Sequence, residues 1–364
     1  MRTLFLLVLL IGRMALAGEI DPYQNRFGRD KPVIAVIAEN HGTELTDFVI
    51  PYGVIARSRS AELVAVATQA GPVKMLPALS INPQATIDEF DARYPDGADY
   101  LIVPAVSKSS DPALLAWVAA QGAKGAAVVS ICDGALVVAN SGLFKGRRAT
   151  GHWATESYRK ERYPDTQWLS NVRYVADGKV VSSAGVSAAM PTALALVEAI
   201  AGRELAADLA RQIGAGDWGT AHDSDIFKPR LGTNLGAYIT GYTNQWFHAI
   251  DQLGLPVAAG VDEIALAYTA DAWSRSKRSK VHAVAADGLP VPTLNGLALL
   301  PDGAGVAGLR MLPPLSTTTP PGTALDESLD AIAKRYGPGT AKLVALEFEY
   351  LPASAPSPHA ITLH

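Results

Sequence analysis

The sequence predicts an α/β fold built on a mostly parallel sheet that is flanked by helices. Residues 33–39 and 126–131 are continuously apolar and rich in β-branched side chains, as expected for strands buried on both faces. Segments of helical length alternate with these and other short apolar runs along the chain. Strands that alternate with helices indicate βαβ units, in which consecutive strands are parallel.

After its first strand, the region continues with an expected helix over residues 45–56. Pro51 lies inside this helix and should kink or shorten it, because proline donates no N–H and its ring clashes with the preceding turn. Residues 63–67 and 100–103 are short apolar runs and are predicted to be strands. The next helix is expected over residues 112–121, with a proline in its first turn, where proline is tolerated.

The second half of the region contains an abrupt strand-to-helix junction. The strand predicted at residues 126–131 is followed almost at once by a helix over residues 133–141, which Gly142 would end. The remaining expected elements are the strands 172–176 and 180–183, joined by a tight Asp-Gly turn, and an apolar helix over residues 191–201.

Length and composition limit the possible functions. A chain of 364 residues suggests about two domains, and its formal charge of −4 argues against a nucleic-acid partner. The single cysteine excludes an intramolecular disulfide and a Cys-rich zinc site.

The polar loop 222–225 lacks convincing metal-ligand spacing and is expected to cap the next segment. Without a phosphate loop or dinucleotide motif, we expect no metal and no cofactor, and a small molecule as the partner.

The N-terminal residues 1–17 are predicted to be a secretory signal peptide. A short basic start precedes an apolar run too short to span a bilayer, and an Ala-x-Ala pattern ends at Ala17. Arg13 lies inside the cleavage region, and the alternative is an uncleaved N-terminal anchor. A cleaved product would be periplasmic or secreted, because no later segment is long enough to span a membrane. The C-terminal residues 352–364 are expected to be disordered.

The second half of the chain contains a weak echo of the first. When the sequence is shifted onto itself, Gly42 falls on Gly260, and residues 57–58 fall on 275–276. After one insertion, the strand 100–103 falls on residues 342–345, which are therefore expected to form a strand. Residues 231–350 would then be a smaller α/β segment and a possible partial copy of the domain at residues 31–215. The alternative is chance similarity between two α/β segments.

Cys132 lies at the strand-to-helix junction. A sharp turn of this kind is typical of a nucleophile elbow, which presents a side chain above the sheet. The N–H groups at the start of the helix are expected to lower the thiol pKa and, through Asp133, to hold an oxyanion. The alternative is a small buried cysteine with no chemical role.

Several motifs around this cysteine are recognisable. The segments SICDGA at residues 130–135 and GRRATGHW at residues 146–153 resemble the ThiJ/PfpI family (the DJ-one proteins) of the class I glutamine-amidotransferase-like superfamily. Matches at residues 42–51 and 173–188 extend the resemblance over about residues 31–215. Isocyanide hydratases and the sensor domains of AraC-type regulators are especially similar.

The resemblance implies a flavodoxin-like fold with Cys132 at the active site. Asp47 matches the family's acidic residue, which is normally protonated and donates a hydrogen bond to the thiolate. His152 would lie nearby and could relay protons, or it could simply pack beside Trp153. Glu44 could share the pocket rim or be a solvated residue at the start of the helix. Relatives commonly dimerise, so either a homodimer or a second copy replacing the partner within one chain is possible.

Two departures from the family pattern leave the function open. The Pro-Gly-Gly turn that completes the oxyanion site in many relatives is absent, although the N–H of Ala105 or Val106 could still point inward. The DNA-binding module of the regulators is also absent. Two hypotheses follow: an exported Cys-dependent hydratase, hydrolase or lyase acting on a small electrophile, or a non-catalytic domain that binds a small molecule or senses oxidation.

Overall fold

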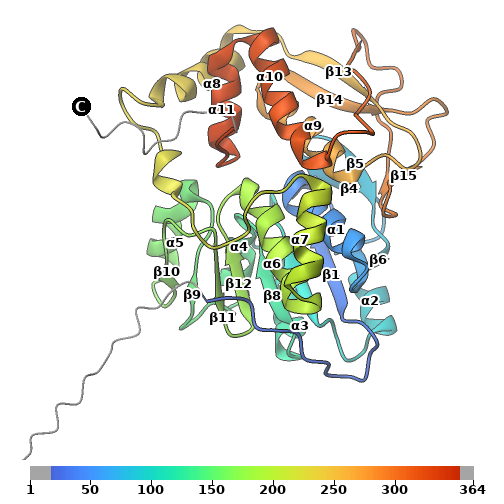
Figure 1. Cartoon of the computed structure of the whole chain (residues 1–364), viewed down its shortest axis with the longest axis vertical. Coiled ribbons are helices and arrows are strands. Elements are labelled where there is room, and N and C mark those ends of the chain that lie inside the picture. The colour runs from blue at the N-terminus through green and yellow to red at the C-terminus, as the bar shows by residue number, and fades with distance from the viewer. Residues whose placement is uncertain (1–17, 353–364) are drawn as a thin grey trace, which may run out of the picture.

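The computed structural model describes residues 18–352 as two α/β regions packed one above the other (Figure 1). The predicted signal peptide, residues 1–17, and residues 353–364 of the predicted disordered tail lie outside the described residues. Within residues 18–352, no helix is both long and apolar enough to cross a bilayer.

The lower region in Figure 1 contains a seven-stranded sheet with the order β11-β12-β8-β7-β1-β3-β6. All neighbours are parallel except β11 and β12, which form a hairpin. The predicted mostly parallel sheet flanked by helices is therefore confirmed. Its strands are β1 (Val33–Ala38), β3 (Glu62–Ala67), β6 (Ala85–Thr86), β7 (Tyr100–Val103), β8 (Ala127–Ser130), β11 (Tyr174–Asp177) and β12 (Val180–Ser183).

Helices cover both faces of this sheet because the strand residues that point to either face are apolar. Along β1, Ile34, Val36 and Ala38 belong to one apolar cluster, and the residues between them belong to another. The first cluster packs under α1 (Leu45–Ser58), α6 (Ala189–Ala201) and α7 (Arg203–Ile213); the second packs under α2 (Ile87–Arg93), α3 (Pro112–Ala123) and α4 (Gly134–Asn140). Helix α1 continues through Pro51 to Ser58, so the proline does not shorten it.

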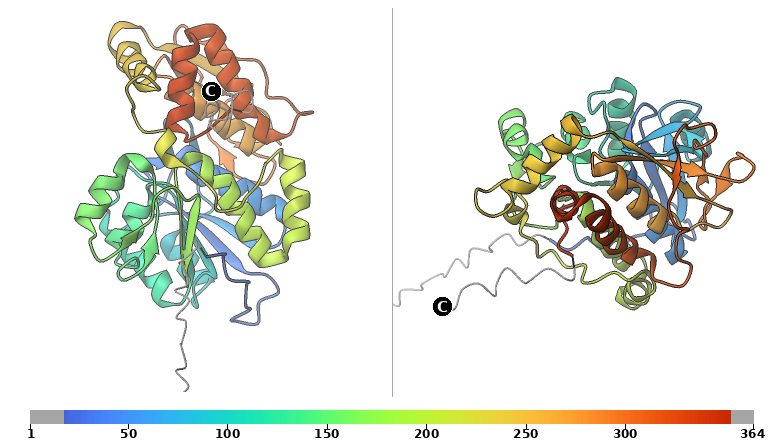
Figure 2. Two further views of the ribbon diagram at one scale, coloured as in Figure 1. Left: turned by 60° about the vertical axis from the view of Figure 1, so that its left-hand side comes forward. Right: turned by 90° about the horizontal axis from the view of Figure 1, so that it is seen from above.

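The upper region repeats the order strand, helix, strand. A three-stranded parallel sheet has the order β14-β13-β17, and α9 connects β13 to β14. Further helices pack around it, as both views in Figure 2 show. The elements are α8 (Leu235–Phe247), β13 (Asp251–Pro256), α9 (Glu263–Arg275), β14 (Ser279–Val284), β17 (Arg310–Met311), α10 (Ala324–Tyr336) and α11 (Pro338–Glu347).

The strand expected at residues 342–345 is wrong. These residues lie in α11, which begins with Pro338 in its first turn, where proline favours a helix. Leu343 of this helix packs with residues of α8, and Val344 joins the central core. A short apolar run fits either a strand or a buried helix, and here the tertiary packing selects the helix.

The two regions are joined by a sheet and by a common core. A five-stranded sheet, ordered β15-β16-β5-β4-β2, combines strands from both regions at the side of the molecule (Figure 1). One apolar cluster runs without interruption from α1 and α6 into α9 and α11. The strands are β2 (Thr43–Glu44), β4 (Val73–Leu76), β5 (Ser80–Asn82), β15 (Val291–Pro292) and β16 (Ala298–Leu299).

Candidate active site

Cys132 lies in a tight turn between β8 and α4. Its backbone φ is 54°, in the left-handed region that non-glycine residues rarely adopt, and its side chain is buried. A Cβ atom at Gly134 would lie 2.0 Å from the carbonyl oxygen of Val103. Only glycine therefore allows the start of α4 to approach the end of β7 so closely. The Cys132 N–H donates to Ser183 Oγ over 3.2 Å, which fixes the turn against β12.

Asp47 lies on α1 and is completely buried. Its Oδ2 atom accepts the N–H of Ala105 over 3.2 Å, and its Oδ1 atom has no hydrogen-bond partner among the described residues. Burial, reinforced by the nearby Glu44, raises the pKa of Asp47 well above its usual range. Burial therefore favours the protonated, neutral form of Asp47.

The backbone donors of the site differ in their availability. The Ala105 N–H, one candidate donor to an oxyanion, donates to Asp47 instead. The Asp133 N–H has no acceptor within residues 18–352. A complete two-donor oxyanion site of the hydrolase kind is therefore not assembled here.

The environment of Cys132 disfavours the thiolate. Burial raises the pKa of the thiol, and the carboxyl groups of Asp47, Asp133, Glu44 and Glu349 raise it further. The expected lowering of this pKa by the helix start is wrong, because α4 has only seven residues and its effect is outweighed by burial and by neighbouring acids. Cys132 is therefore a neutral thiol at rest.

Glu44 faces the site, and its side chain is only 17% exposed to solvent. It immediately precedes α1, and its carboxylate pairs with Arg275 at the end of α9. Arg275 also donates from Nε to Asp271 over 2.8 Å, and Thr46 donates to the same aspartate over 2.9 Å. Burial raises the pKa of Glu44 to about 8, with Arg275 opposing the shift and Asp271 adding to it. The upper region thus supplies Arg275, the cation that contacts both Glu44 and Asp271.

His152 has partners for both ring nitrogens. Nδ1 accepts the N–H of Ala154 over 3.1 Å, and Nε2 lies 3.7 Å from Glu349 Oε1. The ring also packs beside Trp153, with 5.4 Å between the ring centroids. Neither nitrogen is committed to Cys132, so the geometry gives His152 no direct proton transfer with the thiol.

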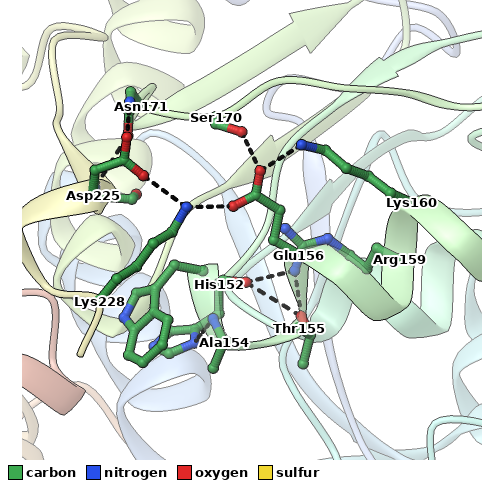
Figure 3. Close-up of polar contacts among 12 residues, drawn as sticks. His152, Ala154, Thr155, Glu156, Arg159, Lys160, Ser170, Asn171, Asp225 and Lys228 are labelled. Atoms are coloured by element: carbon green, nitrogen blue, oxygen red, sulfur yellow. Dashed lines mark hydrogen bonds and ion pairs between the residues drawn. The ribbon is translucent and has the colours of Figure 1, made fainter. Parts of the chain in front are cut away.

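The segment that follows His152 is held by a dense polar network (Figure 3). Thr155 lies at the end of η1 (Trp153–Thr155) and donates to Asp133 over 2.6 Å. Arg159, on α5 (Glu156–Arg162), is almost fully buried and donates to the His152 carbonyl over 2.6 Å. Glu156 accepts hydrogen bonds from Lys160, Ser170 and Lys228 (Figure 3). Burial by itself would raise the pKa of Glu156, but these bonds outweigh it and lower the pKa to about 2.

Both regions line the cavity at Cys132, which has a volume of about 370 Å³. Cys132, Glu44 and His152 come from the lower region, and Tyr238, Arg275 and Glu347 come from the upper one. Sequence reasoning missed the last three. The internal echo places Arg275 opposite Arg57, but it carries no signal that Arg275 reaches the cysteine. Within residues 18–352, no three His, Cys, Asp or Glu side chains are grouped as a metal site requires.

Comparison with known proteins identifies the lower region. The model of the DJ-1/PfpI family matches residues 32–199. The HTH-type transcriptional regulator CdhR of Pseudomonas aeruginosa is 29% identical over 149 residues, which cover 40% of this chain and 43% of the regulator. The isonitrile hydratase of Pseudomonas putida is 27% identical over 165 residues, which cover 44% of this chain and 68% of the hydratase. The match therefore spans less than half of the regulator's length.

Solved structures show similarity over about half of the chain. Drosophila melanogaster DJ-1beta aligns with a TM-score of 0.46 at 20% identity, covering 51% of this chain and 99% of that protein. A ThiJ/PfpI family protein from Pseudomonas syringae aligns with a TM-score of 0.45 at 25% identity, covering 52% of this chain and 80% of that protein.

Proposed function

We propose, from the premise that residues 32–199 form a DJ-1/PfpI family domain, that Cys132 adds to a small neutral electrophile with a carbon–nitrogen multiple bond. An isonitrile is the substrate class we favour, and one relative is an isonitrile hydratase. The observation that carries the proposal is the cavity lined by the Cys132 thiol, with the fully buried Asp47 carboxyl near enough to raise the pKa of that thiol.

The arrangement of donors supports addition over acyl transfer. Acyl transfer develops negative charge on an oxygen that the enzyme must stabilise with hydrogen-bond donors. Here the Ala105 N–H is already bound to Asp47, and the Asp133 N–H is the remaining backbone donor at the cysteine turn. Addition of a thiol to an isonitrile creates no oxyanion in its first step, so the missing donor is no obstacle.

The chemistry balances with the groups present. Cys132 Sγ forms a bond to the terminal carbon of the isonitrile, and the thiol proton passes through Asp47 to the same carbon, which gives a thioimidate. Water then adds to that carbon, and the sulfur leaves with a proton returned through Asp47. The products are an N-substituted formamide and the original thiol. A protonated cysteine suits this sequence, because its own proton is consumed and then restored.

A second candidate is a binding module without turnover. The raised thiol pKa favours it, because a cysteine that stays protonated is a weak nucleophile. The similarity to an HTH-type transcriptional regulator also supports this candidate. In this case the cavity at Cys132 would hold a small molecule reversibly.

Conversion of a small alkyl isonitrile, followed by NMR of the formamide, separates the two candidates. We expect turnover by the wild type and a loss of at least about 100-fold in Cys132→Ser, as for removal of a nucleophile. Turnover that survives the serine substitution would contradict cysteine catalysis. Saturable binding of the isonitrile without formamide would favour the binding module.

We also propose that the chain is exported, with residues 1–17 as its signal peptide. The basic start, the short apolar run and the Ala-x-Ala pattern support this proposal. N-terminal sequencing of the protein recovered from cells tests it. A mature chain that starts at Gly18 is expected, and one that starts at Met1 would contradict cleavage.

A further inference from the structure

A second, larger cavity lies between the two regions, outside the cysteine site. Its volume is about 730 Å³, within the range of small-molecule sites, which are common where domains meet. Its apolar wall includes Met190 on α6, Leu325 on α10 and Phe227. Tyr268 on α9, His222 and Glu349 supply polar atoms.

We propose that this cavity binds a compact aromatic molecule with one hydroxyl or N–H group, and that Glu349 transmits its occupancy to the cysteine site. The Tyr268 hydroxyl and His222 Nδ1 have no hydrogen-bond partner within residues 18–352, so both are free for a ligand. The His222 ring stacks on Phe227 with 5.7 Å between the ring centroids, so this wall of the cavity is aromatic, a surface on which flat rings stack. The proposal does not depend on the catalytic one.

Glu349 forms the link because its two carboxylate oxygens contact residues that belong to different cavities. Oε1 accepts the N–H of Trp153 over 3.2 Å and lies 3.7 Å from His152, and both residues line the cysteine cavity. Oε2 lies 2.7 Å from His222 Nε2 and accepts from Ser224 over 3.1 Å. A ligand that contacts His222 therefore acts on a group that also touches the cysteine site.

The position of Glu349 is tightly determined. Its backbone φ is 54°, and its carboxyl group is inaccessible to solvent. A Cβ at Gly185 would lie 2.6 Å from the Glu349 carboxyl carbon, so glycine is needed there to make room. A side chain held this firmly on both sides passes a displacement on one side to the other.

Calorimetric titration with 4-methylphenol tests the binding site, with indole as a second probe. We expect saturable 1:1 binding at millimolar or lower concentration in the wild type and in Cys132→Ser. Tyr268→Phe, which keeps the ring and removes the hydroxyl, should weaken the binding of 4-methylphenol about fivefold. Gly216→Trp should abolish binding, because Gly216 lines this cavity and a Cβ there meets open space. Gly216→Ala is its matched control and should bind normally.

Alkylation by iodoacetamide tests the link, since Cys132 is the one thiol of the chain. Saturating 4-methylphenol should change the alkylation rate of the wild type at least twofold, and should leave the rate of Glu349→Gln unchanged. Circular dichroism confirms that each variant is folded. Absence of saturable binding by both probes, or undiminished binding to Gly216→Trp, would overturn the site. Binding with no change in the wild-type alkylation rate would overturn the link.

Discussion

The units β1-α1-β3 and β13-α9-β14 have the same order and the same parallel pairing, yet they have different roles. Helix α1 carries Asp47 toward Cys132, whereas α9 has Ala265 at the corresponding position. The two helices pack together through reciprocal pairs. Glu44 of the first pairs with Arg275 of the second, and Arg57 of the first pairs with Asp262 of the second. An interface of this kind resembles that of a symmetric dimer.

The residue at the start of each helix explains part of the difference. Asp262 caps its own helix, accepting the N–H groups of Ile264 and Ala265. Glu44, one methylene longer, makes no capping bond, and its carboxylate instead lines the cysteine cavity. The residue before α1 therefore contributes its side chain to the cysteine cavity, whereas the residue before α9 stabilises its own helix.

A second difference lies one turn away from the reciprocal ion pairs. Asp271 of α9 accepts a hydrogen bond from Thr46 and binds Arg275. The position of α1 that corresponds to Asp271 is Gly53, which lies against Ile264 and has no carboxylate. Arg275 consequently holds two carboxylates, and Arg57 holds one. Arg275 is thus more important for neutralising charge, although the two arginines occupy equivalent positions.

Replacing Arg275 should have the largest effect on stability. Arg275→Met leaves the fully buried Asp271 without its cation, so the free energy of unfolding should fall by about 3–5 kcal/mol. Urea denaturation followed by circular dichroism measures this change.

Arg57→Met is the matched control for Arg275→Met. Asp262 keeps its two backbone donors and is 22% exposed, so we expect a loss of about 1 kcal/mol. Equal losses in the two variants would show that the two ends of the α1–α9 interface are equivalent after all.

Replacing Asp47 should have the largest effect on reactivity after Cys132 itself. Asp47→Asn cannot relay the thiol proton, so hydration of an isonitrile should slow by about 100-fold, or about 2.7 kcal/mol in the activation barrier. Initial rates of formamide formation measure the effect. Ala265→Ser, at the corresponding position of α9, should leave the rate within about twofold. Full activity of Asp47→Asn would remove Asp47 from the mechanism.

Glu44 should make stability depend on pH. Its pKa is about 8 in the folded protein and 4.5 ordinarily, so between these values the folded state binds more protons than the unfolded state. Stability therefore falls as the pH rises from 4.5 to about 8, by at most about 1.4 kcal/mol per pH unit for one proton.

Urea denaturation at a series of pH values between 5 and 9 tests this dependence. Glu44→Gln should flatten the fall in stability, because the group that takes up the proton is gone. Asp262→Asn, its counterpart on α9, retains Glu44 and should keep the wild-type slope. A slope that Glu44→Gln leaves unchanged would assign the proton to another group.

The sequence by itself determined the main sheet and the turn that holds Cys132. These features follow from local patterns: continuous apolar runs at residues 33–39 and 126–131, and a glycine two positions after the cysteine. The family resemblance at residues 42–51 added the expectation that Asp47 lies near the cysteine, and the Asp47 carboxyl contributes to the raised pKa of the thiol.

Tertiary structure alone decided the electrostatics and the walls of the site. Arg275, Tyr238 and Glu349 reach it from elements far along the chain, and no local pattern marks them. The raised pKa of Cys132 likewise depends on burial and on several distant carboxyl groups. A pKa is set by the sum of all nearby charges and by the loss of water, and both depend on which surfaces the fold brings together.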